Sequence, residues 1–72
     1  MKDERLIVFG QVIRRLREEK GISQEAFAGL VGIDRSYMGR IERGENNVTL
    51  TRIYQISEAL GISPADIFEL LR

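Results

Sequence analysis

The chain has 72 residues, no cysteine and no histidine, and its 11 lysine and arginine residues balance its 11 acidic residues. A chain of this length forms one small domain that hides only about 60% of the surface its unfolded form exposes. The composition excludes disulfides and the usual zinc ligand sets, and the zero net charge argues against a gross attraction to nucleic acid or membranes. A partner subunit would supply the buried area that such a small core lacks.

No stretch of the sequence is apolar for long enough to cross a membrane. The longest apolar run, Leu6 to Phe9, is far shorter than the roughly 20 residues of a spanning helix. Asp3 and Glu4 place acidic charge where a signal peptide begins with basic residues. We therefore expect a cytoplasmic protein without a membrane partner.

The first predicted helix carries an apolar stripe and ends at Gly21. The stripe, with spacings of three, four and three, consists of Leu6, Phe9, Ile13 and Leu16. Val8 and Val12 form a second, narrower stripe on the same helix.

Two short helices follow, separated only by Gly32, Ile33 and Asp34. Ser23 and Asp34 are suited to be their N-caps, because a short side-chain oxygen accepts from the free amides of the next turn, and Gly32 and Gly44 are suited to end them. Their apolar faces are supplied by Ala26, Phe27, Leu30 and Val31, and by Met38 and Ile41. So short a connection holds two helices at a steep angle, which is the geometry of a helix-turn-helix unit.

Two further helices complete the chain. Thr49 is the expected N-cap of the fourth helix and Gly61 its end, and Ser63 followed by Pro64 is typical of a fifth helix start. Their apolar positions are Leu50, Ile53, Ile56, Ala59 and Leu60, and then Ile67, Leu70 and Leu71. We therefore predict one all-α domain over residues 1–72, a compact five-helix bundle with a central helix-turn-helix.

The helix that follows Asp34 carries hydrogen-bond donors on the side opposite Met38 and Ile41. This outer arc holds Arg35, Ser36, Gly39, Arg40 and Arg43, with Tyr37 at its edge. Arginine forks suit the O6 and N7 acceptors of guanine and phosphate oxygens, and serine serves either kind of contact. Surface arginines usually lie on a solvated face, but together on the second helix of such a unit they predict a major-groove reader.

The run LREEKGISQEAFAGLVGIDRSYMGRIERGENNVTL, followed by ALGIS, resembles the Cro and phage-repressor type of helix-turn-helix domain over roughly residues 9 to 68. The residues at the spacing of that family are Arg17, Gln24, Ala28, Ile33, Ile41, Glu42 and Gly44. Within the family, GIDRSYMGRIERG is most similar to the controller proteins of bacterial restriction-modification systems. The resemblance implies a lambda-repressor-like fold and a homodimeric transcriptional regulator that binds a palindrome in double-stranded DNA.

The resemblance also implies roles for single residues. Base-edge contacts fall to Arg35, Ser36 and Arg40, and phosphate contacts to Gln24, Arg43, Asn46 and Asn47. Tyr37 matches a position placed against the DNA backbone, although it also suits the edge of the core. Arg17 and Glu42 match a structural ion pair. The chain departs from the controllers at Met-Gly-Arg from 38 to 40, where they often have Ile-Ser-Gly, and at Asn46, where a basic residue suits phosphate better.

The glycine at position 39 has two interpretations. It either lets the helix approach a base edge closely or reflects a tolerant exposed site, and it costs about 1 kcal/mol of helix stability relative to alanine. The sequence leaves both open.

The last helix is apolar on more than one side, because Phe68 lies off the stripe of Ile67, Leu70 and Leu71. In similar controllers the C-terminal helices form the two-fold contact, so we expect Ile67, Phe68 and Leu71 to contribute to a dimer interface. The alternative is packing on Val8 and Val12 of the first helix. Glu25 resembles the acidic surface that such regulators present to RNA polymerase.

The fold and the composition also bear on two other classes of function, a protein-interaction module and an enzyme. The same fold serves in antitoxins and coactivator-like proteins, so a protein-interaction module is the alternative to DNA binding. An enzyme is not expected, because the serines lack a histidine base and no cysteine thiolate is available. Glu18 and Glu19 point to different helix faces, and no glycine-rich phosphate loop or metal motif occurs. We therefore expect no catalytic residue, cofactor or metal site.

Overall fold

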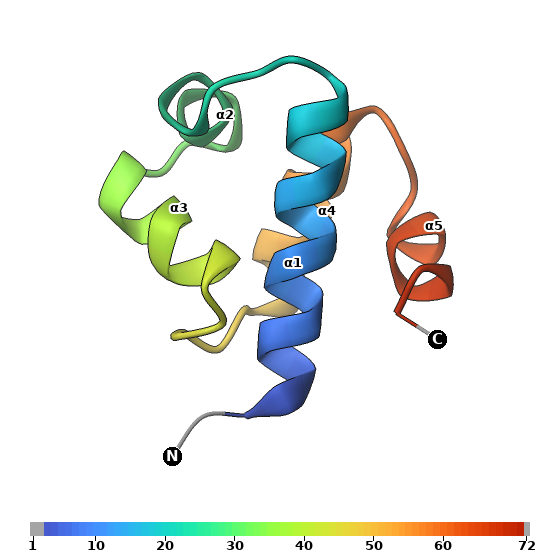
Figure 1. Cartoon of the computed structure of the whole chain (residues 1–72). Helices are drawn as coiled ribbons and strands as arrows, with labels where there is room; N and C mark the ends of the chain where they lie inside the picture. Colours follow the sequence, from blue (N-terminus) through green and yellow to red (C-terminus); the bar gives the residue numbers. More distant parts are fainter. Residues whose placement is uncertain (1–2, 72) are drawn as a thin grey trace.

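The computed structural model describes residues 3–71, which form five helices and contain no strand. These are α1 (Glu4–Glu19), α2 (Gln24–Val31), α3 (Arg35–Glu42), α4 (Leu50–Leu60) and α5 (Pro64–Glu69). In Figure 1, α1 stands in front of α4, with α2 and α3 on one side and α5 on the other. The all-α expectation is confirmed. Over residues 3–71, none of the helices has the length and apolar character needed to cross a bilayer.

The predicted N-caps of α2 to α5 are confirmed. The side chains of Ser23, Asp34, Thr49 and Ser63 each accept a hydrogen bond from the backbone N–H three residues further on. Each cap satisfies an amide that has no partner within its helix, so four helix starts follow from local chemistry.

The turn between α2 and α3 consists of Gly32, Ile33 and Asp34. Gly32 has a φ of +91°, a conformation that glycine adopts without steric cost. The N–H groups of Gly32 and Ile33 both donate to the carbonyl of Ala28, at 2.9 and 3.0 Å. Figure 1 shows α2 almost end-on while α3 runs across the view, so the turn produces the predicted helix-turn-helix arrangement.

The core lies between the helices, and one side of α3 faces into it. Its largest fully buried apolar side chains are Ile13, Phe27, Met38, Ile41, Ile56, Leu60 and Ile67. The expected narrow stripe on α1 is only half correct, because Val12 is buried whereas Val8 is 40% exposed. The burial of Met38 and Ile41 fixes which side of α3 remains in solvent.

A close approach between α1 and the end of α3 depends on Gly10, a residue that the sequence pattern did not single out. A Cβ atom at this position would overlap the backbone carbonyl oxygens of Ile41 and Glu42. Because the obstacle is backbone, it cannot move aside as a flexible side chain would. Gly10 therefore sets how closely α3 sits on α1.

The fifth helix is shorter than its apolar repeat suggests. The N–H groups of Leu70 and Leu71 donate to the carbonyls three residues back, at 3.0 and 3.1 Å, which is the tighter turn common at helix ends. Leu70 is 42% exposed while Ile67 is fully buried. Of the apolar repeat Ile67, Leu70 and Leu71, Leu70 therefore remains at the surface.

Candidate nucleic-acid interface

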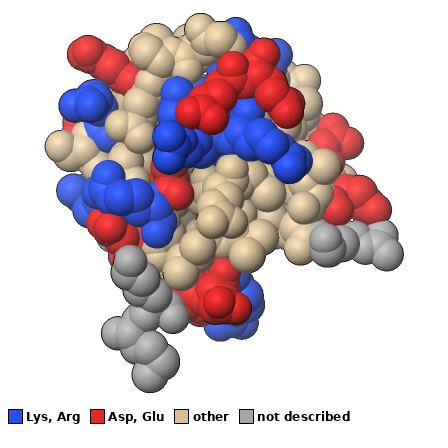
Figure 2. All heavy atoms as spheres, viewed as in Figure 1, with Lys and Arg blue, Asp and Glu red and all other residues tan. Residues whose placement is uncertain are grey.

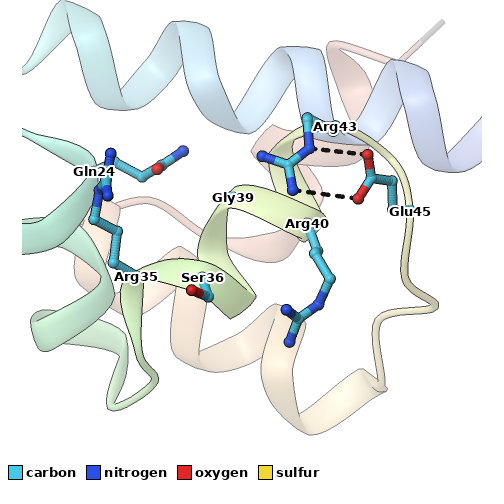
Figure 3. Close-up of a pocket in the computed structure, with 7 residues that line it drawn as sticks. All are labelled: Gln24, Arg35, Ser36, Gly39, Arg40, Arg43 and Glu45. Carbon is cyan, nitrogen blue, oxygen red and sulfur yellow. Dashed lines mark hydrogen bonds and ion pairs between the residues drawn. The ribbon is translucent and has the colours of Figure 1, made fainter.

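The outer face of α3 brings together the residues predicted to read DNA. Because Met38 and Ile41 point into the core, Arg35, Ser36 and Arg40 are directed to solvent, and all three are exposed. They line a shallow hollow that also includes Gln24, Gly39, Arg43 and Glu45 (Figure 3). The surface is rich in hydrogen-bond donors that lie within reach of one ligand.

The chemistry of this hollow favours a ligand with acceptor groups. The guanidinium groups of Arg35 and Arg40 donate in a planar fork, which matches guanine edges and phosphate oxygens. The hydroxyl of Ser36 both donates and accepts. Glu45 is the one acidic side chain among the described residues of the hollow.

Arg43, predicted to contact phosphate, is paired within the protein. Its Nε and Nη2 atoms donate to the carboxylate of Glu45 at 2.9 and 3.2 Å, as Figure 3 shows. This carboxylate raises the pKa of the Arg43 guanidinium. Since the Arg43 side chain is 59% exposed, a phosphate can reach it, but only in competition with Glu45. The sequence analysis did not identify Glu45 as part of the site.

Gln24, also predicted to contact phosphate, lies at the start of α2 and is partly buried. Its Nε2 atom donates to Oε1 of Glu42 at 3.0 Å. Glu42 accepts in addition from Arg17, so Gln24 joins the surface of the site to an interior ion pair. An amide nitrogen carries two N–H groups, so the bond to Glu42 leaves the second one for another acceptor.

Tyr37 lies at the edge of α3, between two arginines. The guanidinium carbons of Arg40 and Arg52 lie 5.6 and 5.4 Å from the centre of its ring, within cation–π range. The side chain is partly buried and packs against the core. Arg52 comes from α4, and no spacing in the sequence links it to Tyr37, which is why the sequence analysis missed it.

Asn46 and Asn47 follow α3 in the loop toward α4, and they differ in their surroundings. Asn47 is exposed, whereas Asn46 is partly buried. When the Asn46 amide is oriented so that both its atoms have partners, its oxygen accepts from Arg40 Nε at 3.2 Å and its nitrogen donates to the Glu45 carbonyl at 3.0 Å. Asn46 therefore contacts a predicted base-reading residue directly.

Gly39 lies beneath the Arg43 side chain. A Cβ atom here would be 3.0 Å from Nη1 of Arg43 and 3.6 Å from Oε1 of Gln24. The glycine thus leaves room for the Arg43 guanidinium to lie across α3, an interpretation that the sequence analysis did not consider. The contact is with a flexible side chain, so it is softer than the one at Gly10.

The basic residues of α1 do not form a continuous basic surface. Nε of Arg14 lies 3.2 Å from the carboxylate of Glu18, and Nε of Arg15 lies 3.9 Å from that of Glu19. Figure 2 shows basic and acidic side chains next to one another on the face that carries α1. Arg14 and Arg15 are therefore compensated by acidic side chains of their own helix.

The three residues predicted to form a dimer interface differ in how deeply they are buried. Ile67 has 0% exposure and belongs to the core, so it has no surface left for a partner and the prediction is wrong for this residue. Phe68 is 46% exposed, and Leu71 is partly buried. Both line an apolar groove together with Arg5, Leu6, Phe9, Val48 and Ile53. Leu71 also lines a second hollow, together with Glu4, Arg5 and Val8 of α1.

Comparisons with known proteins agree with this geometry. A family model described as helix-turn-helix matches residues 13–67. The chain is 43% identical over 63 residues to control protein C.MunI of Mycoplasma sp, covering 86% of this chain and 85% of that protein. It is 42% identical over 64 residues to control protein C.BamHI of Bacillus amyloliquefaciens, covering 88% and 79%.

Solved structures include similar proteins, two of which superpose on most of this chain. The restriction-modification controller protein C.AhdI from Aeromonas hydrophila superposes with a TM-score of 0.85 and 51% identity, covering 88% of this chain and 96% of that one. The wild-type controller protein C.Esp1396I superposes with a TM-score of 0.89 and 34% identity, covering 97% and 91%.

Proposed function

Since the chain belongs to the helix-turn-helix family, we propose that it is a sequence-specific DNA-binding transcriptional regulator of the restriction-modification controller type. The observation that carries the proposal is the outer face of α3, where Arg35, Ser36 and Arg40 are exposed beside one another on a helix whose other side is buried. A helix of this kind enters the major groove and contacts base edges.

The polar residues of the hollow and of the loop after α3 divide the work of binding. Arg35, Ser36 and Arg40 contact base edges, while Gln24, Arg43 and Asn47 contact phosphates and fix the orientation of the protein. Because the net charge is zero, non-specific attraction is weak and specificity rests on a few contacts. A regulator of this kind acts where the DNA lies, so the location that we propose for it is the cytoplasm.

The binding unit is a homodimer on an imperfect palindrome. Two copies of α3 would enter successive major grooves about 34 Å apart. The apolar groove that contains Phe68 and Leu71 supports this assembly, because a partner copy would cover apolar surface that one chain leaves in water.

Selection from random-sequence duplex DNA tests the proposal. We expect one palindromic motif to be enriched, and we expect Arg35→Ala and Arg40→Ala each to lose about 1–3 kcal/mol of binding mainly on that motif. Gln24→Ala should weaken all sequences more evenly. Arg14→Ala, which removes an exposed arginine paired on α1, serves as the control. If no motif is enriched, the protein-interaction module is the better interpretation.

Glu25 supports a role in activation. It lies in the first turn of α2, where its carboxylate is exposed on the surface. We propose that it contacts RNA polymerase at the promoter. Glu25→Ala should then leave operator binding unchanged but reduce transcription from the regulated promoter in a purified system, and unchanged transcription would count against this role.

A further inference from the structure

We infer that Arg40 is held in a fixed orientation by Asn46 and Tyr37, which act as positioning residues for its contact with bases. The inference rests on the proposed function and makes Arg40 the preorganised member of its base-reading residues. It also replaces the role in phosphate binding that the family resemblance implies for Asn46.

Asn46 holds the middle of the Arg40 side chain. Its amide oxygen accepts from Nε at 3.2 Å, while its amide nitrogen donates to the backbone carbonyl of Glu45 at 3.0 Å. The backbone N–H of Glu45 in turn donates to the carbonyl of Arg40 at 2.9 Å. The loop after α3 is thus tied to Arg40 through both backbone and side chain. Because Asn46 occupies Nε, the N–H groups on both terminal nitrogens remain for a ligand.

Tyr37 supports the guanidinium from one side. The guanidinium carbon of Arg40 lies 5.6 Å from the ring centre, and that of Arg52 lies 5.4 Å from it. Arg52 is itself held, because its Nη1 donates to Oε1 of Gln55 at 2.8 Å. The ring is therefore fixed between α3 and α4 before any DNA arrives, and a ring fixed in this way limits where the Arg40 head can go.

Preorganisation matters for arginine because its side chain has many rotamers. A free arginine loses that freedom when it binds a base, and the loss weakens binding. Holding Arg40 in advance reduces the loss and keeps its fork at one angle, which a bidentate contact with a base requires. Over residues 3–71, the Arg35 side chain makes no comparable hydrogen bond or ring contact, so of the two arginines proposed to read bases only Arg40 is held in this way.

A double-mutant cycle on the enriched operator tests the inference. Arg40→Ala should weaken binding about 5- to 100-fold, with the loss concentrated on particular base pairs. Asn46→Ala should weaken binding about three- to tenfold at those same base pairs, and this loss should disappear in the Arg40→Ala background. Asn47→Ala, in the neighbouring exposed residue, is the matched control and should add to Arg40→Ala.

Tyr37 variants and a measurement without DNA complete the experiment. Tyr37→Phe keeps the ring and should keep the base preference, whereas Tyr37→Leu should relax it at the Arg40 base pairs. In the free protein, the NMR signal of the Arg40 Nε–H should show slowed side-chain motion that Asn46→Ala abolishes. The inference is overturned if that motion is the same in both proteins, or if Asn46→Ala still weakens binding without Arg40. Failure of the wild type to enrich a motif would instead overturn the proposed function, since the NMR result does not depend on DNA.

Discussion

Nε of Arg17 lies 2.8 Å from Oε2 of Glu42, and the two side chains are only 10% and 3% exposed. A second bond joins Nη2 to Oε1 at 3.1 Å, and Nη1 donates to the carbonyl of Ile22 at 2.9 Å. The hydrogen bonds that Arg17 donates to the Glu42 carboxylate raise the pKa of the Arg17 guanidinium. This pair connects α1 to the end of α3 and, through Gln24, to the start of α2. The orientation of α3 therefore depends on an interior charge pair.

Breaking this pair from one side should destabilise the fold strongly. Arg17→Met leaves the Glu42 carboxylate without its main partner, and Glu42→Leu leaves the Arg17 guanidinium without its acidic partner. Either substitution should lower the free energy of unfolding by about 3–5 kcal/mol. The double variant Arg17→Met/Glu42→Leu should be more stable than either single one, because it buries no unpaired charge. Urea unfolding at one fixed protein concentration measures all three. Additive losses in the double variant would contradict this account.

Removing the Glu45 carboxylate should strengthen binding to DNA. In Glu45→Gln the Arg43 guanidinium no longer has an acidic partner, so it is available to phosphate. We expect tighter binding to operator and random DNA alike, and a dependence of log affinity on log salt that is steeper by up to about 0.9. Glu58→Gln removes an exposed carboxylate near the end of α4 and is the charge-matched control. Unchanged affinity in Glu45→Gln would show that the Arg43–Glu45 pair does not compete with DNA.

Substituting Phe68 should dissociate the proposed homodimer. Burying a side chain of this size contributes about 1.5–3 kcal/mol per copy, and Phe68→Asp replaces that gain with a charge in an apolar groove. Sedimentation equilibrium should then report the monomer mass. Leu30→Asp changes a residue that is 63% exposed on α2, away from α5 in Figure 1, and should leave the mass unchanged. A dimer of undiminished stability in Phe68→Asp would exclude this interface.

The acid stability of the protein should depend in part on Asp3. Its carboxyl caps α1, and hydrogen bonds from the side chain and backbone of Arg5 lower its pKa from 3.8 to about 2. The pKa is lower in the folded state, so this contribution is present above about pH 4 and is lost as the pH falls toward about 2. Asp3→Asn retains a good N-cap but not the charge. Urea unfolding across this range should show a flatter fall in stability for Asp3→Asn, and equal slopes would contradict the assignment.

The features that sequence predicted correctly are those set by residues near one another in the chain. A capping side chain such as Ser23 or Thr49 acts within its own helical turn, so it marks a helix start without knowledge of the fold. The same holds for the turn at Gly32, and for the side of α3 that must be buried, since Met38 and Ile41 share one face. These local rules were sufficient to predict the helix-turn-helix unit and its exposed donors.

The features that were missed or misjudged depend on contacts between separate elements. Arg40 and Asn46 were given separate roles, a base contact and a phosphate contact, yet they lie in contact. Ile67 was assigned to a dimer surface, but the direction in which α5 packs decides that it is core. Arg52 reaches Tyr37 from another helix. A single sequence carries no signal for pairs of this kind, because their spacing along the chain has no periodicity.

Two glycines in helices offer a direct test of the approach between α1 and α3. At Gly10 an added Cβ would overlap the carbonyls of Ile41 and Glu42, whereas at Gly29 it would meet nothing within 4 Å. Gly10→Ala should therefore destabilise the protein by about 1–3 kcal/mol through overpacking. Gly29→Ala should stabilise it by about 0.5–1 kcal/mol, because alanine restricts the unfolded chain and favours α2. Urea unfolding followed by circular dichroism measures both. If Gly10→Ala were as stable as Gly29→Ala, α3 would have to sit further from α1 than the structure places it, and the Arg17–Glu42 pair that joins the two helices would have to lengthen with it.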